Sequence, residues 1–182
     1  MNTTFINQNS ERNIHEAGKA SLISRSADLR YYMEVGFNED SEELRDYVNN
    51  PHNSLSFGEI RDLINQRDDL GNFFDYGLCF DYVELGTFND QKEDYFRFQI
   101  SWGGPSEEIR FYENGTIEYV YLDWFSGVGF DVTREDWADW LDNFYKGADM
   151  MNFQEKRESY DYYEQLDRIE NPEEYAETEE EN

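Results

Sequence analysis

The sequence predicts an α+β fold, with an antiparallel sheet of about four strands, short N-terminal helices and a C-terminal helical pair. Three observations lead to this class. Apolar residues alternate with polar ones within residues 78–124, which is the period of a half-buried strand. Before and after that stretch they recur every three or four positions, as on a helix face. Aromatic residues form 18% of the chain, enough large side chains to build a core.

The N-terminal part of the chain combines a polar segment with helix signals. Residues 1–25 contain few large apolar groups, and we interpret them as a mobile arm or a weak helix. A helix face follows at three-to-four spacing, formed by Leu29, Tyr32, Met33 and Phe37. Two short helices are expected after it, over residues 41–48 and, from the capping box of Ser56 and Glu59, over residues 56–64.

The strand predictions lie in the middle of the chain. The clearest strand covers residues 96–102, where every second residue is large and apolar: Phe96, Phe98, Ile100 and Trp102. Residues 78–83 alternate in the same way, so Cys79 is expected to be a small buried core residue rather than a nucleophile. Turns are expected at Gly103-Gly104-Pro105 and at Asn114-Gly115, a dipeptide that accepts the positive φ of a type I′ hairpin at both positions.

Helical spacing returns at Thr133, which has capping-box spacing to Asp136. The apolar face of this helix is expected to hold Trp137, Trp140, Leu141 and Phe144, with Glu135, Asp139 and Asp142 on the other side. A last helix over residues 153–169 has the apolar stripe Tyr162, Tyr163, Leu166 and Ile169. The expected organisation is an arm over residues 1–25, a single α+β domain over residues 26–170 and a disordered acidic tail over residues 171–182.

The chain is strongly acidic, with 42 Asp and Glu against 15 Lys and Arg and a formal net charge of −27. The excess is spread along the chain: residues 31–130 hold 21 acids against 6 bases, and residues 131–182 hold 18 against 5. Such a surface repels phosphates and anionic lipid headgroups, so we expect neither direct nucleic-acid binding nor membrane binding. It favours a basic partner, a protein or ribonucleoprotein that itself holds nucleic acid.

Six carboxylates recur at every third residue of the last predicted helix: Glu155, Glu158, Asp161, Glu164, Asp167 and Glu170. On a helix they follow one another every ~4.5 Å along the axis, close to the ~3.4 Å between phosphates of one DNA strand. We therefore predict that these six residues, together with Glu135, Asp139 and Asp142, bind the partner by phosphate mimicry. A solvated helix surface is the alternative interpretation of the same pattern.

Motifs for catalysis or cofactor binding are weak. Acidic pairs at residues 68–69 and 107–108, with Asp123, could be arranged around Mg²⁺, but their spacing resembles no known ligand frame. His15 and His52 have no Cys or His partner at zinc spacing. The glycines match neither a P-loop nor a dinucleotide fingerprint. We predict no metal, no cofactor and no catalytic residue.

Compartment signals indicate a cytoplasmic protein. A single cysteine allows no internal disulfide. The first residues have neither the basic start nor the apolar run of a signal peptide. No stretch approaches the roughly 20 apolar residues of a membrane span.

Two segments resemble a family of small acidic accessory proteins carried by conjugative plasmids and related mobile elements. Residues 95–111 read YFRFQISWGGPSEEIRF, and residues 122–127 read LDWFSG. The likeness covers about residues 78–144 and departs at Ile109, where Phe is expected, and at Ser126, where Asp is expected. No catalytic residues are carried over from this family. The resemblance implies a mobile-element origin, which fits an anti-defence role in a bacterial host cell.

In charge, size and acidic C-terminus the whole chain is also similar to phage-encoded anti-restriction DNA mimics and to anti-CRISPR proteins. We therefore expect a non-enzymatic inhibitor of a host defence nuclease, preferably a CRISPR effector complex, that occupies its positively charged nucleic-acid channel. Three alternatives remain open: an anti-restriction DNA mimic, a metal-dependent nuclease that cuts the effector's guide RNA, and a plasmid-maintenance protein that regulates a basic DNA-binding partner.

Overall fold

The computed structural model describes residues 3–6, 11–35, 70–88, 91–124 and 126–170. The chain divides into two compact units, Met1–Phe144 and Tyr145–Asn182. The first unit contains the sheet and the helices α1 (Glu11–Val35) and α4 (Phe73–Tyr76), together with most of α5 (Asp136–Gly147). The second unit contains α6 (Phe153–Glu170). The predicted helices over residues 41–48 and 56–64 and the predicted tail over residues 171–182 lie outside the described residues.

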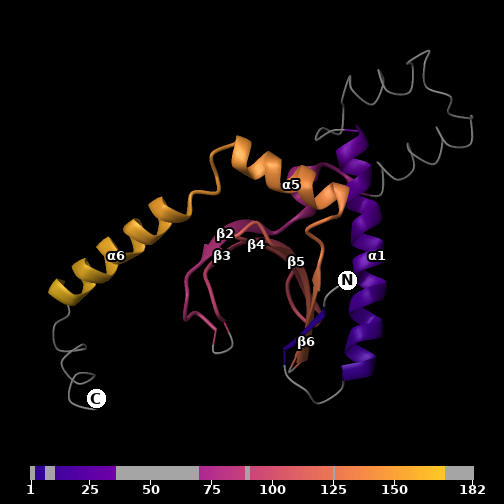
Figure 1. Cartoon of the computed structure of the whole chain (residues 1–182), viewed down its shortest axis with the longest axis horizontal. Helices are drawn as coiled ribbons and strands as arrows, with labels where there is room; N and C mark the ends of the chain where they lie inside the picture. Colours follow the sequence, from indigo (N-terminus) through magenta and orange to yellow (C-terminus); the bar gives the residue numbers. More distant parts are fainter. Residues whose placement is uncertain (1–2, 7–10, 36–69, 89–90, 125, 171–182) are drawn as a thin grey trace, which may run out of the picture. The chain divides into compact units, whose positions relative to one another are not determined.

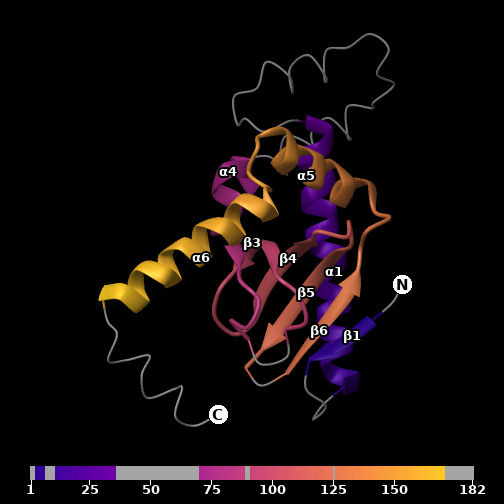
Figure 2. The ribbon, with the colours of Figure 1, turned by 60° about the vertical axis from the view of Figure 1, so that its left-hand side comes forward.

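The first unit is built on a six-stranded sheet in the order β1-β6-β5-β4-β3-β2, in which every neighbouring pair is antiparallel (Figure 2). The strands are β1 (Thr3–Ile6), β2 (Cys79–Val83), β3 (Tyr95–Ser101), β4 (Ser106–Tyr112), β5 (Ile117–Asp123) and β6 (Ser126–Asp131). β2 to β6 follow one another as a meander. β1, from the N-terminus, adds to the free edge of β6.

The α+β class and the C-terminal helical pair are confirmed. An N-terminal helix is present, but it has 25 residues where short helices were expected, and the predicted number of strands was too low. β2 to β5 occupy the stretch in which four strands were expected. β6 was missed because its sequence, SGVGFD, contains two glycines and reads as a turn. β1 was missed because it lies in the polar segment interpreted as an arm.

The helix α1 (Glu11–Val35) covers one face of the sheet, beside β5 and β6 (Figures 1 and 2). It includes more than half of the segment that we had interpreted as an arm or a weak helix. Its buried side includes two small residues, Gly18 and Ser26, among the larger Ile14, Leu22, Leu29 and Tyr32. A Cβ at Gly18 would lie 2.6 Å from Val128 Cγ1, so glycine here allows the helix to approach β6 closely.

An aromatic cluster joins α1, the sheet and the C-terminal helix of this unit. Its centre is Phe73 in the short helix α4 (Phe73–Tyr76), which Asn72 caps by accepting a 2.8 Å hydrogen bond from Phe74 N. The Phe73 ring lies within 5.9 Å, centroid to centroid, of the rings of Tyr32, Phe98, Trp140 and Phe144.

The helix α5 (Asp136–Gly147) buries Trp137 and Leu141 completely, as its apolar spacing predicts. The predicted capping box at Thr133 is wrong. The Thr133 hydroxyl instead accepts a 2.9 Å hydrogen bond from Ile117 N in β5, and the helix begins three residues later. Tertiary contact with the sheet therefore decides where this segment becomes helical.

The predicted hairpin at Asn114-Gly115 connects β4 and β5, closed by a 2.9 Å hydrogen bond from Gly115 N to Tyr112 O. Of the two residues only Gly115 has a positive φ, 85°, so the turn is not the predicted type I′. Trp102, expected on the buried face of the strand, lies beyond the end of β3 and is exposed. Within the described residues, no helix is long and apolar enough to cross a bilayer.

Candidate functional site

Carboxylates line the helix α6 (Phe153–Glu170), where the sequence predicted the partner-binding series. The described side chains Glu155, Glu158, Asp161 and Asp167 are all exposed. Those of Glu164 and Glu170 lie outside the described part. An α-helix of 18 residues is about 27 Å long, so the series extends over several turns.

Local hydrogen bonds support the first turns of α6. Asn152 Oδ1 accepts from Glu155 N at 3.1 Å, and its carbonyl oxygen accepts from Lys156 N at 3.1 Å, so Asn152 acts as the N-cap. Gln154 Nε2 donates to Glu158 Oε1 at 2.9 Å, one turn along the helix. The carboxylates are thus presented on a regular, capped helix.

The predicted apolar stripe of α6 is wrong for its described members, because Tyr162 and Tyr163 are 59% and 65% exposed. The side chains of Leu166 and Ile169 lie outside the described part. Among the described side chains of α6, the buried one is Phe153 in the first turn, with the Arg157 guanidinium carbon 5.5 Å from its ring centroid. Neither tyrosine therefore holds the helix by burial.

The three α5 candidates differ in their surroundings. Glu135, just before α5, forms an ion pair with Arg30 of α1, with 2.6 Å between Oε2 and Nη2. This ion pair connects the two helices. Asp139 is exposed and accepts a 3.2 Å hydrogen bond from Asn143 Nδ2. Asp142 is half-buried. Of these three, Asp139 is the most accessible to a partner.

A buried carboxylate network lies between α1 and the sheet. Glu107 of β4 is 4% exposed and pairs with Arg25 of α1, with 2.7 Å from NH2 to Oε2. It also accepts hydrogen bonds from Tyr119 at 2.7 Å, from Ser101 at 3.0 Å and from Ser21. The ion pair is thus embedded in further donors that satisfy the remaining lone pairs of the carboxylate.

These contacts set the ionisation of Glu107. Burial raises the pKa of a carboxylate, because it penalises the charged form. Here the hydrogen bonds from Arg25, Ser21 and Tyr119 outweigh burial and lower the pKa of Glu107 to about 2. Burial, with the neighbouring Glu107, raises the pKa of Tyr119 well above its usual value, so this hydroxyl remains a donor. Glu107 is a permanent anion inside the fold.

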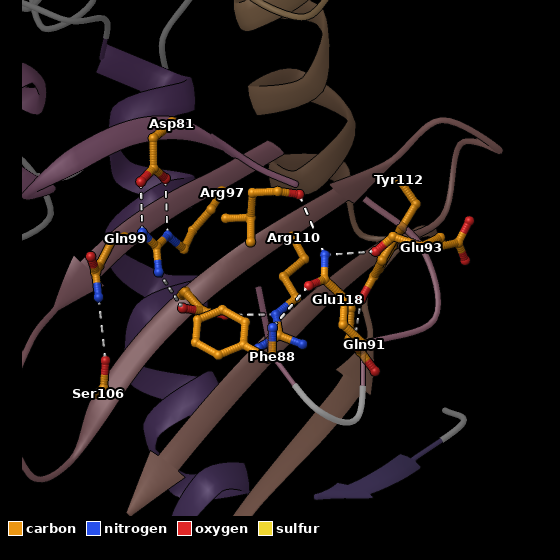
Figure 3. A network of polar contacts seen from close by, with 12 residues as sticks. Asp81, Phe88, Gln91, Glu93, Arg97, Gln99, Ser106, Arg110, Tyr112 and Glu118 are labelled. Carbon is orange, nitrogen blue, oxygen red and sulfur yellow. Dashed lines mark hydrogen bonds and ion pairs between the residues drawn. The ribbon is translucent and has the colours of Figure 1, made fainter. Parts of the chain in front are cut away.

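The opposite face of the sheet carries a row of charged residues across its strands (Figure 3). Asp81, Arg97, Arg110 and Glu118 are successive cross-strand partners. Arg97 makes a two-pronged contact with Asp81, at 2.9 and 2.6 Å. Buried Glu108 lies between the two arginines, 2.6 Å from Arg110 Nε and 3.7 Å from Arg97 NH1, and separates their like charges.

The four arginines Arg25, Arg30, Arg97 and Arg110 therefore all pair with carboxylates of the same chain, and the Arg30 pair is partly exposed. Hydrogen bonding to Glu107 raises the pKa of Arg25, and hydrogen bonding to Asp81 raises that of Arg97. Each of these cations already has a carboxylate partner within the chain, so it is less available to repel a basic partner.

The geometry gives little support to the metal interpretation. Glu107 and Glu108 are neighbours in β4 and so point to opposite faces of the sheet, each toward arginine. Among the described residues, no group of three His, Cys, Asp or Glu side chains could hold a metal ion. Asp68, Asp69 and His52 lie outside that part of the chain.

Cys79 is exposed, so its predicted place in the core is wrong. It lies in the edge strand β2, on the side away from α1, with its Sγ 3.6 Å from Gln99 Oε1. Partial burial and the neighbouring Asp81 raise the pKa of the thiol, which disfavours the nucleophilic thiolate.

Two exposed tryptophans were not predicted as functional residues. Trp102 and Trp124 are 74% and 84% exposed, although the strand pattern placed Trp102 on a buried face. Their positions beside turn residues, Gly103-Gly104-Pro105 and the β5–β6 connection, were the available signal.

Comparison with protein-family models, with curated proteins and with solved structures finds no match for this chain.

Proposed function

We propose that this chain is a non-enzymatic inhibitor of a host defence nuclease, preferably a CRISPR effector complex. It binds the positively charged channel of the nuclease by presenting carboxylates where phosphates are normally held. The observation that carries the proposal is the exposed carboxylate series on the capped helix α6, in a chain of net charge −27. Asp139 of α5 adds a further exposed acid.

The internal pairing of the arginines supports this proposal. A protein whose basic and acidic residues were mixed on its surface would offer a channel both attraction and repulsion. Here four arginines are already paired with carboxylates of the same chain, so they offer little local repulsion to a basic surface, while the net negative charge steers association. On α6 itself six acids stand against three bases, Lys156, Arg157 and Arg168, so the attraction is a property of the whole surface as well as of the helix.

The choice of partner rests on spacing and on shape. Carboxylates separated by ~4.5 Å along a helix can meet Lys and Arg placed to hold phosphates ~3.4 Å apart. A CRISPR effector offers such residues along its heteroduplex channel and its displaced-strand groove. A restriction enzyme's DNA cleft offers the same chemistry, and an inhibition assay with each nuclease distinguishes the two.

Stoichiometry distinguishes this inhibitor from the guide-cutting nuclease. A mimic protects the target only near or above one inhibitor per effector, and its binding is unaffected by EDTA. Shortened guide RNA produced at about a hundredfold substoichiometric ratio, and abolished by EDTA, would show metal-dependent turnover and overturn the proposal.

The decisive variant tests the helix itself. Changing Glu155, Glu158, Asp161 and Asp167 to their amides removes four exposed charges with little change in shape. We expect binding to weaken by about 1 kcal/mol or more per well-paired site, measured by titration calorimetry with the purified effector. Truncation after Pro172 is expected to have a smaller effect.

The matched control removes four charges elsewhere. Asp75, Glu93, Glu113 and Asp149 are exposed, and their amide variants give the same net charge. If the control weakens binding as much as the α6 variant, attraction is diffuse and α6 is not the binding element. If truncation abolishes inhibition while the α6 variant retains it, the acidic tail is the effector.

A further inference from the structure

Trp102 and Trp124 lie at the same end of the sheet. β4 begins and β5 ends next to each other, because Ser106 is the cross-strand partner of Leu122. Trp102 follows β3 and Trp124 follows β5, so the two hairpin turns that carry them are neighbours. We call these two residues the tryptophan edge.

The Trp124 indole contacts the backbone of the neighbouring turn. A Cβ added at Gly104 would lie 2.7 Å from Trp124 Nε1 and 3.1 Å from Cε2, so the indole rests on the bare backbone of Gly104. The rest of the ring faces solvent, since the residue is 84% exposed. An exposed side chain that already has a contact on one side is suited to recognition, because part of its conformational freedom is restricted before binding.

The backbone of Trp124 is unfavourable for a residue of its size. Its φ is 48°, in the left-handed region that glycine and asparagine tolerate and bulky residues avoid. Burial cannot account for tryptophan here, because the side chain buries little of its surface. Strain without a packing gain is typical of positions that serve binding.

We propose that the tryptophan edge docks arginine side chains on the basic surface of a protein partner. This inference rests on the proposed function for the basic character of the partner, and it adds aromatic anchors to the carboxylates of α6. The planar guanidinium stacks on an indole face by cation–π attraction, and tryptophan is the aromatic residue that binds cations best. Exposed Asp123, next to Trp124, supplies a carboxylate for the same cation.

The fold already uses this contact internally. The guanidinium carbon of Arg110 lies 4.7 Å from the ring centroid of Tyr95, and that of Arg25 lies 5.9 Å from the centroid of Tyr76. At the tryptophan edge both rings are exposed, and the neighbouring exposed Asp123 repels anionic ligands. A cationic protein surface therefore fits better than a nucleic acid or an anionic membrane.

The experiment uses an oligo-arginine peptide of about ten residues, with oligo-lysine of equal length as the comparison. Affinity is measured by calorimetry on the full chain at about 50 and about 500 mM salt. The double variant Trp102→Ala/Trp124→Ala is expected to raise the Kd for oligo-arginine about tenfold and the Kd for oligo-lysine by less. The matched control, Phe74→Ala with Phe88→Ala, removes two other exposed aromatic side chains and is expected to bind as the wild type does.

Two glycine variants separate binding from folding. Gly104→Ala pushes the Trp124 indole from its place without removing it and is expected to weaken oligo-arginine binding, whereas Gly147→Ala, which meets nothing within 4 Å, is not. Trp124→Gly removes the strain at this positive φ, so the unfolding midpoint is expected to hold or rise while oligo-arginine binding weakens. A marked fall in that midpoint would make Trp124 a structural residue and overturn the inference.

Other outcomes distinguish this inference from the function on which it rests. If the double tryptophan variant binds oligo-arginine as tightly as the wild type does, while the α6 amide variant binds the effector weakly, the edge is not an anchor and the proposed function stands. If both variants bind as the wild type does, both proposals fail. If sedimentation shows that the wild type dimerises and the tryptophan variant does not, the occupant is a second copy and the inference is wrong.

Discussion

Glu107 is a charged residue held in the interior of the fold. Its carboxylate is surrounded by Arg25 and by three hydroxyl donors, so it is ionised at neutral pH despite its burial. Such an ion pair contributes less to the free energy of folding than its short distances suggest, because both ions lose hydration when the chain folds. Its removal is nonetheless costly, because the remaining partner is left with an uncompensated charge.

The pKa of Glu107 gives a pH dependence with a definite sign. The pKa of Glu107 in the folded protein, about 2, is lower than the usual glutamate value of 4.5. The carboxylate therefore stabilises the fold above about pH 5, and this contribution is lost as the pH falls from 4.5 toward 2. We expect Glu107→Gln to lose about 2 kcal/mol or more of unfolding free energy at pH 7 and to show a smaller further loss on acidification than the wild type.

Urea unfolding at several pH values measures both effects. Glu93→Gln, which removes an exposed carboxylate, serves as the control and is expected to change the free energy of unfolding by less than about 0.5 kcal/mol. Equal pH profiles for the wild type and Glu107→Gln would show that the carboxylate contributes no linkage.

At the scale of the elements, small residues explain which parts of the fold could be predicted. The strands β2 to β5 are visible in the sequence because large apolar residues mark their buried face. Most of α1 and the whole of β6 could not be recognised from the sequence, because glycines at Gly18 and Gly129 allow neighbouring elements to pack closely there. A Cβ at Gly18 would meet Val128, and a Cβ at Gly129 would meet the Glu118 side chain. A glycine whose missing side chain makes room for a neighbour cannot be distinguished, from one sequence, from a glycine in a turn.

The candidate site was predictable to a similar degree. Helical spacing placed the α6 carboxylates on a helix, and the described ones are exposed. The ion pair of Glu135 with Arg30 could not be foreseen, because it joins residues 105 positions apart in the chain. The tryptophan edge could not be predicted either. A period-two pattern predicts which residues share a face of a strand but not where the strand ends, and β3 ends one residue before Trp102.

Phe73 and Phe74 offer a sharp test of how the elements are joined. They are neighbours in α4, yet Phe73 is 2% exposed and Phe74 is 63% exposed. Phe73 contacts rings from α1, β3 and α5, so its removal opens a cavity where three elements meet. We expect Phe73→Ala to lower the free energy of unfolding by about 3–5 kcal/mol and Phe74→Ala by less than about 1 kcal/mol.

Denaturant unfolding followed by far-ultraviolet circular dichroism measures this difference in the free energy of unfolding directly. Equal losses for the two variants would mean that α4 contributes to stability through its backbone and caps, and that the aromatic cluster does not join the elements.

At the scale of the whole molecule, the charge of −27 acts on folding and on binding with opposite signs. In the free protein the exposed acids repel one another, which destabilises the compact state. In a complex with a basic partner the same acids are attractive. Salt screens both effects, with a Debye length of about 10 Å at 0.1 M and about 3 Å at 1 M.

Raising the salt concentration from about 50 to about 500 mM should therefore stabilise the free protein and weaken its complex. Calorimetric unfolding and effector titration over the same salt series measure the two slopes. The α6 amide variant removes four charges and should show a shallower slope in both. The tryptophan variant should keep the slope of the wild type but bind more weakly at every salt concentration, because cation–π stacking of a desolvated guanidinium is screened less than exposed ion pairs are. A complex equally tight across the series would contradict phosphate mimicry and assign the affinity to apolar contact.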